Sequence, residues 1–156
     1  MHRSPGFTLV ELVIVIAIVG IGAVLVAPMF TDLMRSSRIT TTTNNIVEAL
    51  ATARSEAIRQ AQPVKVVPVG GNWVNGWEVQ VSATNTVISR FDPIPNTIAV
   101  NAVPAIASIE FQPSGMRTAP ALESILSICG GVPNGRQIQL HPSGSSKINS
   151  LYAGCP

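Results

Sequence analysis

The sequence has few charged and aromatic residues, and very little histidine or cysteine. Of its 156 residues, 12% are charged and 4% are aromatic, with two histidines and two cysteines. It contains no phosphate-binding loop, no paired-carboxylate spacing and no Cys/His cluster with metal-ligand spacing. We therefore expect no enzymatic activity, no metal and no cofactor. The formal net charge of +2, without a run of like charges, does not by itself indicate a polyanionic partner.

The sequence also contains one long run of apolar residues. It extends from Phe7 to Phe30 and contains a single charged residue, Glu11. About 20 apolar residues span a bilayer as a helix, so we predict a transmembrane helix over residues 7–30. A carboxylate inside such a segment is costly and is usually functional.

The run does not have the layout of an ordinary secretory signal. In such a signal a small-residue cleavage site follows the apolar stretch, whereas here the small residue Gly6 precedes it. The apolar segment would thus be retained after cleavage behind Gly6, which would create a new α-amine on Phe7. In a bundle of such helices, Glu11 of one subunit could pair with the Phe7 amine of its neighbour, so that each buried charge has a partner.

The stretch Gly6-Phe-Thr-Leu-Val-Glu11 resembles the leader and processing site of type IV pilins and pseudopilins. The resemblance implies that residues 1–6 are a leader peptide and that a prepilin peptidase cleaves between Gly6 and Phe7. It also implies N-methylation of Phe7 and assembly of a helix bundle guided by Glu11.

Three further residues indicate where this helix would loosen in a filament. Pro28 falls where the family commonly carries a helix-kinking proline, and Gly20 and Gly22 lie upstream of it. Proline removes a helix hydrogen bond, and glycine weakens a helix by about 1 kcal/mol relative to alanine.

The pattern of apolar residues changes twice after the apolar run. A helical stripe from Ile46 onward predicts an amphipathic continuation of the helix over 31–62, ended by Pro63. Residues 63–156 have a period of two, broken by Gly- and Pro-rich turns, which predicts an antiparallel β domain. The predicted strands are 64–69, 73–81, 86–91, 97–100, 106–111, 124–129, 136–140 and 147–151. The expected fold is α+β, a long N-terminal helix packed on an antiparallel β-sheet or β-sandwich.

Two residue pairs in the β domain have defined expectations. Trp73 and Trp77 are predicted to share one side of a strand and to pack in the core. The number of cysteines is even, with Cys129 and Cys155, and the chain looks exported. Both features favour one disulfide over two free buried thiols.

The second half is similar to the FimT/GspH group of minor pilins and pseudopilins. The similar segments are Ala53–Arg59 at the helix end, Trp73 with Gly76 and Trp77, and the turn Phe111–Gly115. The resemblance implies the pilin fold and a single-pass inner-membrane subunit with its C-terminal domain in the periplasm. The implied partners are the prepilin peptidase and other pilins or pseudopilins. A minor type IV pilin is the first function implied, and a GspH-like pseudopilin of a type II secretion system is the alternative.

A third function, DNA uptake, rests on two basic residues. Some members of the group bind DNA through a basic "GRxR" motif, and this chain matches its first two positions at Gly135 and Arg136. A second basic strand of the group is represented here by Lys147 alone. Arg136 and Lys147 are therefore the candidate DNA contacts, and the missing arginines count against them.

Overall fold

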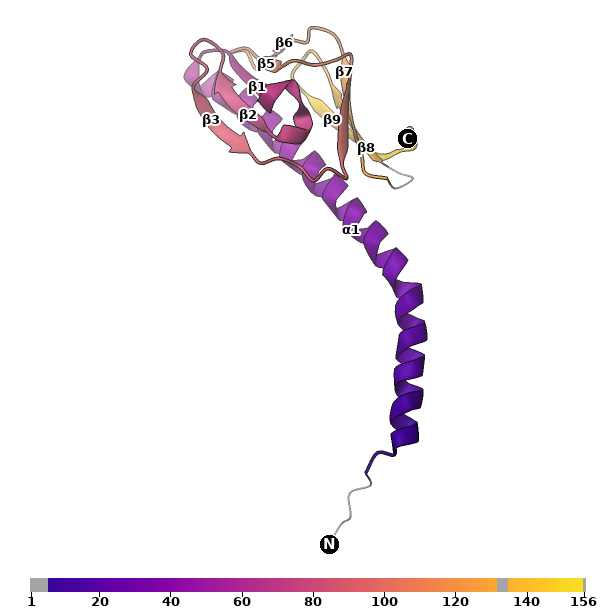
Figure 1. The fold of residues 1–156 in the computed structure, drawn as a ribbon. Coiled ribbons are helices and arrows are strands. Elements are labelled where there is room, and N and C mark those ends of the chain that lie inside the picture. The colour runs from indigo at the N-terminus through magenta and orange to yellow at the C-terminus, as the bar shows by residue number, and fades with distance from the viewer. Residues whose placement is uncertain (1–5, 132–134, 156) are drawn as a thin grey trace. The chain divides into compact units, whose positions relative to one another are not determined.

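Helix α1, Leu9–Gln60, is followed by short antiparallel strands (Figure 1). The computed structural model describes residues 6–131 and 135–155, without the side chains of 24–29, 150 and 151. The chain divides into two compact units, Met1–Met34 and Arg35–Pro156, and α1 contributes to both. The expected α+β fold is confirmed.

The strands of the second unit form two antiparallel sheets. Sheet A has the order β3-β2-β1-β5-β6, and sheet B has the order β4-β7-β8-β9. The strands of sheet A are β1 Val64–Pro68, β2 Trp77–Val81, β3 Val87–Phe91, β5 Ile109–Phe111 and β6 Arg117–Ala119. Those of sheet B are β4 Ala99–Val103, β7 Ser124–Cys129, β8 Gly135–Leu140 and β9 Ser146–Tyr152.

One stripe of α1 packs against both sheets. The buried helix residues recur three or four positions apart, as expected for one face of a helix: Ile39, Thr42, Thr43, Ile46, Ala49, Leu50, Ala53 and Ala57. The apolar residues among them join one cluster with Val66 and Phe111 of sheet A and with Leu126 and Ile138 of sheet B. The helix therefore closes the core that the two sheets share.

The threonine-rich stretch 40–45 is helical, although threonine and asparagine are weak helix formers. Thr43 is fully buried, and its hydroxyl donates to the Ile39 carbonyl oxygen at 2.7 Å. The Thr40 hydroxyl donates to the Ser36 carbonyl in the same way, at 2.9 Å. Tertiary burial and these hydrogen bonds along the helix outweigh the low intrinsic propensity.

The strand predicted over 73–81 begins later, at Trp77. Residues Trp73–Asn75 form the short 3₁₀ helix η2, because the Asn72 side chain caps it by accepting from the Val74 N–H at 3.0 Å. Trp73 and Trp77 are both buried, with ring centroids 6.1 Å apart, so their expected packing in the core is confirmed. Their expected position on one strand is wrong.

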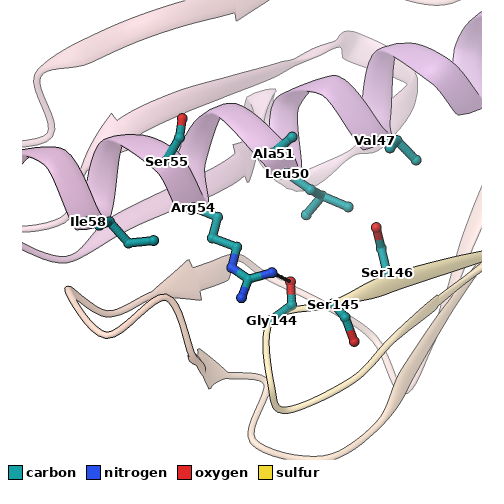
Figure 2. Close-up of a pocket in the computed structure, with 9 residues that line it drawn as sticks. All are labelled: Val47, Leu50, Ala51, Arg54, Ser55, Ile58, Gly144, Ser145 and Ser146. Carbon is teal, nitrogen blue, oxygen red and sulfur yellow. Dashed lines mark hydrogen bonds between the residues drawn. The ribbon is translucent and has the colours of Figure 1, made fainter.

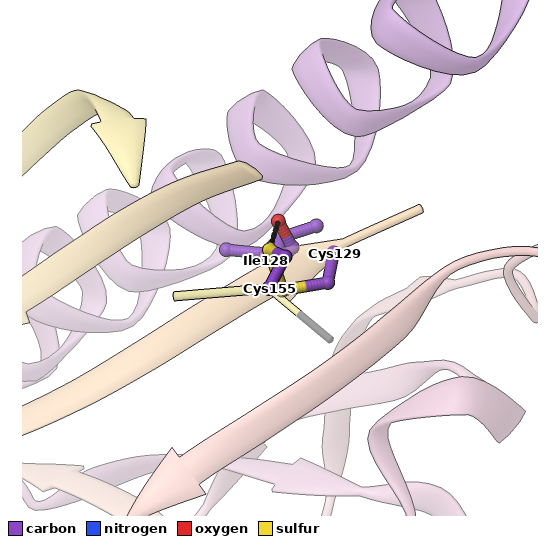
Figure 3. The surroundings of a disulfide bond; sticks show 3 residues. All are labelled: Ile128, Cys129 and Cys155. Atoms are coloured by element: carbon purple, nitrogen blue, oxygen red, sulfur yellow. Dashed lines mark hydrogen bonds between the residues drawn. A yellow bond between two sulfur atoms is a disulfide. The ribbon is translucent and has the colours of Figure 1, made fainter. Parts of the chain in front are cut away.

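The two cysteines form a disulfide, which confirms the favoured pairing. Cys129 at the end of β7 is bonded to Cys155 near the C-terminus, with Cα atoms 5.5 Å apart (Figure 3). The bond ties the segment after β9 back onto sheet B. It closes a sequence separation of 26 residues, and loops of this size stabilise a fold chiefly by restricting the unfolded chain.

Replacing both cysteines, Cys129→Ser with Cys155→Ser, should lower the free energy of unfolding of residues 35–156 by about 3 kcal/mol. Urea denaturation followed by circular dichroism would measure the loss. Reduction of the unaltered protein by dithiothreitol should produce the same shift, which separates the effect of the bond from that of the new serines. An unchanged midpoint in both samples would show that the bond contributes nothing.

Candidate functional site

The predicted processing site lies directly before the first turn of α1. Gly6 and Phe7 precede the helix, and Thr8 caps it, because the Thr8 Oγ1 accepts from the Glu11 N–H at 3.2 Å. The spacing Thr-x-x-Glu is that of a capping box, in which the N-cap hydroxyl accepts from the third helical residue. Sequence reasoning used Glu11 and missed the cap at Thr8, although this spacing was visible.

The described residues of the first unit expose almost all of their apolar side chains. Phe7 is 81% exposed, and most apolar residues of the following turns are more than half exposed. Glu11 is the one charged residue among positions 6–31, and its carboxylate forms no hydrogen bond or ion pair with the described residues. Contiguous apolar surface of this kind marks contact with a membrane or with other proteins.

Within the described part of the chain, no helix is both long and apolar enough to cross a membrane. The span predicted over 7–30 includes residues 24–29, whose side chains lie outside the described residues, and it stays a prediction. Gly20 and Gly22 lie inside α1, and apart from the neighbouring residues and backbone of the helix itself, no heavy atom of the described residues lies within 4 Å of a Cβ added there. Pro28 also falls outside the described side chains, so the predicted loosening of the helix is untested.

In the second unit, two segments that carried the family resemblance meet at Arg54. The Arg54 guanidinium donates to the Gly144 carbonyl oxygen at 3.3 Å, across from helix to turn (Figure 2). A Cβ added at Gly115 would lie 3.2 Å from the Arg54 Nε, and one added at Gly144 would lie 3.4 Å from it. The helix end around Arg54 and the turn ending at Gly115 are therefore packed together, which gives both segments a structural role.

A cavity of about 430 Å³ opens beside this contact, between α1 and the turn before β9. Its lining mixes apolar, hydroxyl and cationic groups: Val47, Leu50, Ala51, Arg54, Ser55, Ile58, Gly144, Ser145 and Ser146 (Figure 2). Ile58, which lines this cavity, is 53% exposed and so lies outside the buried stripe of α1.

The structure does not bring the two candidate DNA contacts together. Arg136 is paired with the buried Ile128 of β7 and lies two residues before the buried Ile138. Its side chain is therefore on the core-facing side of sheet B. Lys147 pairs with Gln139, which points to the opposite side. A phosphate backbone lying on one face of the sheet could not contact both residues.

Arg117 is a buried charge that the sequence analysis did not single out. Its guanidinium donates to the Leu140 carbonyl at 3.1 Å and also to the Leu122 carbonyl, while Nε and Nη1 are buried without a partner among the described residues. Burial lowers the pKa of Arg117, and the nearby Glu123 carboxylate opposes that shift. No local pattern predicted this, because the short strand β6 was not recognised.

The His141 Nδ1 and the Glu123 Oε1 lie 2.8 Å apart, within hydrogen-bonding distance. Among the described residues, no three His, Cys, Asp or Glu side chains are grouped so that they could hold a metal ion.

Comparison with known proteins agrees with both the N-terminal segment and the fold. The family model described as "Type II transport protein GspH" matches residues 42–144, and the "Prokaryotic N-terminal methylation motif" matches residues 1–27. Two proteins of Pseudomonas aeruginosa, each described as "Fimbrial protein", are 38% identical over 64 residues. That alignment covers 41% of this chain and 41% of theirs, so the chain spans about two fifths of the length of these relatives.

Among solved structures, the fold is similar to the type IV minor pilin FimU of Pseudomonas aeruginosa strain PAO1 in two crystal forms. The TM-scores are 0.64 and 0.61, at 20% and 21% sequence identity. The matches cover 72% and 70% of this chain, and 89% and 91% of the FimU chains.

The methylation motif and the helix packed on antiparallel sheets define a type IV pilin-like protein. Proteins of this class are structural subunits and not enzymes. The chain belongs to the GspH family, whose model matches well over half of it.

The contact between Gly115 and Gly144 can be tested by adding a single methyl group. A Cβ at Gly144 would lie 2.2 Å from the Gly115 carbonyl oxygen, and the residue has a φ of +81°. Gly144→Ala should therefore lower the free energy of unfolding by about 3 kcal/mol or more.

Gly71→Ala is the matched control, because Gly71 also has a positive φ but open space around its Cβ. It should cost only roughly 1–2 kcal/mol, the penalty for the left-handed backbone. Equal losses in the two variants, measured by urea denaturation, would contradict the close packing of the two turns.

Proposed function

We propose that this protein is a minor type IV pilin, a subunit that starts or enters a pilus through its N-terminal helix. The observation that carries the proposal is the exposed apolar surface of residues 7–21, which contains one carboxylate. Water would oppose that surface, whereas a bilayer and then a bundle of like helices would each cover it.

Cleavage after Gly6 would place a charged amine on Phe7, just before the first turn of α1. The Thr8 cap already holds the Glu11 backbone in that turn. In a bundle, the Glu11 carboxylate of one subunit would meet the Phe7 amine of its neighbour, and each buried charge would be compensated. N-methylation of Phe7 would keep this positive charge.

The proposal places residues 7–30 in the inner membrane and the β domain in the periplasm. The Cys129–Cys155 disulfide supports this location, because structural disulfides form and persist in oxidising compartments. A prepilin peptidase and other pilins would be the partners.

The second candidate is a pseudopilin of a type II secretion system, which the family name, type II transport protein GspH, favours. Both machines would use the same N-terminal helix. Deleting the gene in its own host, and measuring surface pili and protein secretion side by side, would distinguish them. DNA uptake has no comparable support, because Arg136 and Lys147 lie on opposite faces of sheet B.

Gly6→Val should leave the leader attached, because a branched side chain would occupy the place of the small residue before the cleaved bond. Immunoblotting of the host's membrane fraction would show the longer precursor, and mass spectrometry would find no free N-terminus at Phe7. Gly6→Ala is the control and should be processed, since alanine is also small. Normal processing of the valine variant would remove the leader assignment.

Glu11→Ala should remain in the membrane, yet its incorporation into sheared filaments should fall at least about tenfold, because the buried amine of a neighbour would lose its partner. Glu48→Ala, which removes an exposed carboxylate elsewhere on α1, should assemble normally. Quantitative immunoblotting of filament and membrane fractions would measure both. Equal assembly of the two variants would contradict the proposed pairing.

A further inference from the structure

The two sheets of the second unit end in four edge strands. Sheet A ends in β3 and β6, and sheet B ends in β4 and β9. An edge strand presents unpaired N–H and C=O groups to which another strand can add. Proteins usually block such edges with charges, bulges, proline or very short strands.

Three of these edges carry such a feature. β3 has the exposed Arg90, which forms an ion pair with Glu78, and its pairing with β2 is irregular between Val79 and Gln80. β6 has only three residues. β9 carries the exposed Lys147.

β4 has none of these features within its length. The strand reads Ala-Val-Asn-Ala-Val, and no charged residue occurs anywhere from Pro93 to Ser108. Its pairing with β7 is regular over all five residues. Among the described residues, residues 99–103 form no hydrogen bond outside their ladder with β7. Val103 is 66% exposed and Asn101 is also exposed.

A cavity of about 230 Å³ lies between β4 and the segment Gly71–Trp73. Val100 and Ala102 of β4 line one side, and Trp73 and Ile106 contribute apolar surface. The Trp73 indole N–H is buried and has no acceptor among the described residues. The space suits one uncharged side chain of modest size next to the strand.

We propose that β4 is the docking edge for an extended, uncharged segment of another filament subunit, which adds a strand to sheet B. Backbone hydrogen bonds would hold the added strand, and the cavity beside Trp73 would accept one of its side chains. A neutral segment fits because no charge within 93–108 could compensate a charged one. The identity of the partner as a subunit rests on the proposed function, whereas the docking edge itself rests on β4.

Photo-crosslinking in the host cell would test the strand pairing on the full-length protein. A photoreactive amino acid would replace Asn101 in one variant and Val103 in another, with Val87 on the β3 edge as the matched control. These two β4 positions lie on one face of the strand, so their adducts should map two residues apart on one partner segment. The control position should give no such adduct.

Absence of adducts at positions 101 and 103, or adducts scattered over unrelated sequences, would overturn the proposal. An ordered pair of adducts in a protein that is not a pilin or pseudopilin would keep the docking edge and overturn the identity of the partner. An ordered pair of adducts in a second copy of this chain would show that β4 docks a segment of an identical chain. It would overturn a different subunit as the partner.

Charge substitutions give a second readout. Asn101→Lys and Val103→Lys should each reduce incorporation into filaments about tenfold or more, because an unpaired lysine would face the added strand. Val87→Lys should not, and protease resistance and disulfide content would confirm that all three variants fold. Normal incorporation of both β4 variants would overturn the proposal.

Failure of the proposed function would look different. If the unaltered chain never enters a filament while the ordered crosslinks still form in the membrane fraction, the filament role fails and β4 remains a docking edge.

Discussion

Burial of one stripe of α1 against both sheets is the interaction on which the second unit depends. Sheets A and B share no strand, so their apolar faces need a third surface to close the core. Ala49, Ala53 and Ala57 have small side chains that let the helix lie close to the sheets. Ile46 and Leu50 pack with residues of both sheets in the same apolar cluster. Buried apolar area of this kind is the dominant favourable term in folding.

The first turns of the same helix carry exposed apolar side chains among the described residues. From Ile39 onward the apolar side chains of the stripe are buried, whereas those of residues 9–21 are exposed. The first set stabilises the fold of one molecule. A bilayer or other protein molecules would cover the second set, which is the physical basis of the proposed anchoring and assembly. Glu11 fits this division, because its charge would be costly to bury in one chain alone.

Two surfaces of the second unit differ in whether the fold itself explains them. Arg54 ties the helix end to the turns at Gly115 and Gly144, so the segments that resemble the family there are explained by packing. β4 has no such structural explanation for its neutral, regular edge. A feature that the fold itself does not need is more informative about partners than a contact that the fold does need.

The sequence alone determined the features that depend on local pattern. The long helix, its end before Pro63 and most strands follow from residue spacing, because side-chain periodicity is a property of neighbouring residues. The processing motif follows from the resemblance of residues 6–11 to a known family. Ser124–Cys129 was predicted with the bounds that the structure has. The pairing of Cys129 with Cys155 was favoured but left open against free thiols, and the structure decided it by bringing the two Cα atoms within 5.5 Å.

Only the tertiary structure decided the features that depend on register and strand order. The short strand β6 exists because β5 lies beside it, and the stretch 40–45 stays helical because Thr42 and Thr43 are buried. Arg136 and Lys147 lie on opposite faces of sheet B because side chains alternate along paired strands. No local pattern specifies the register of that pairing. β4 is an edge because of where sheet B stops. Strand order and register are set by contacts between residues far apart in the chain, and local propensity carries no information about them.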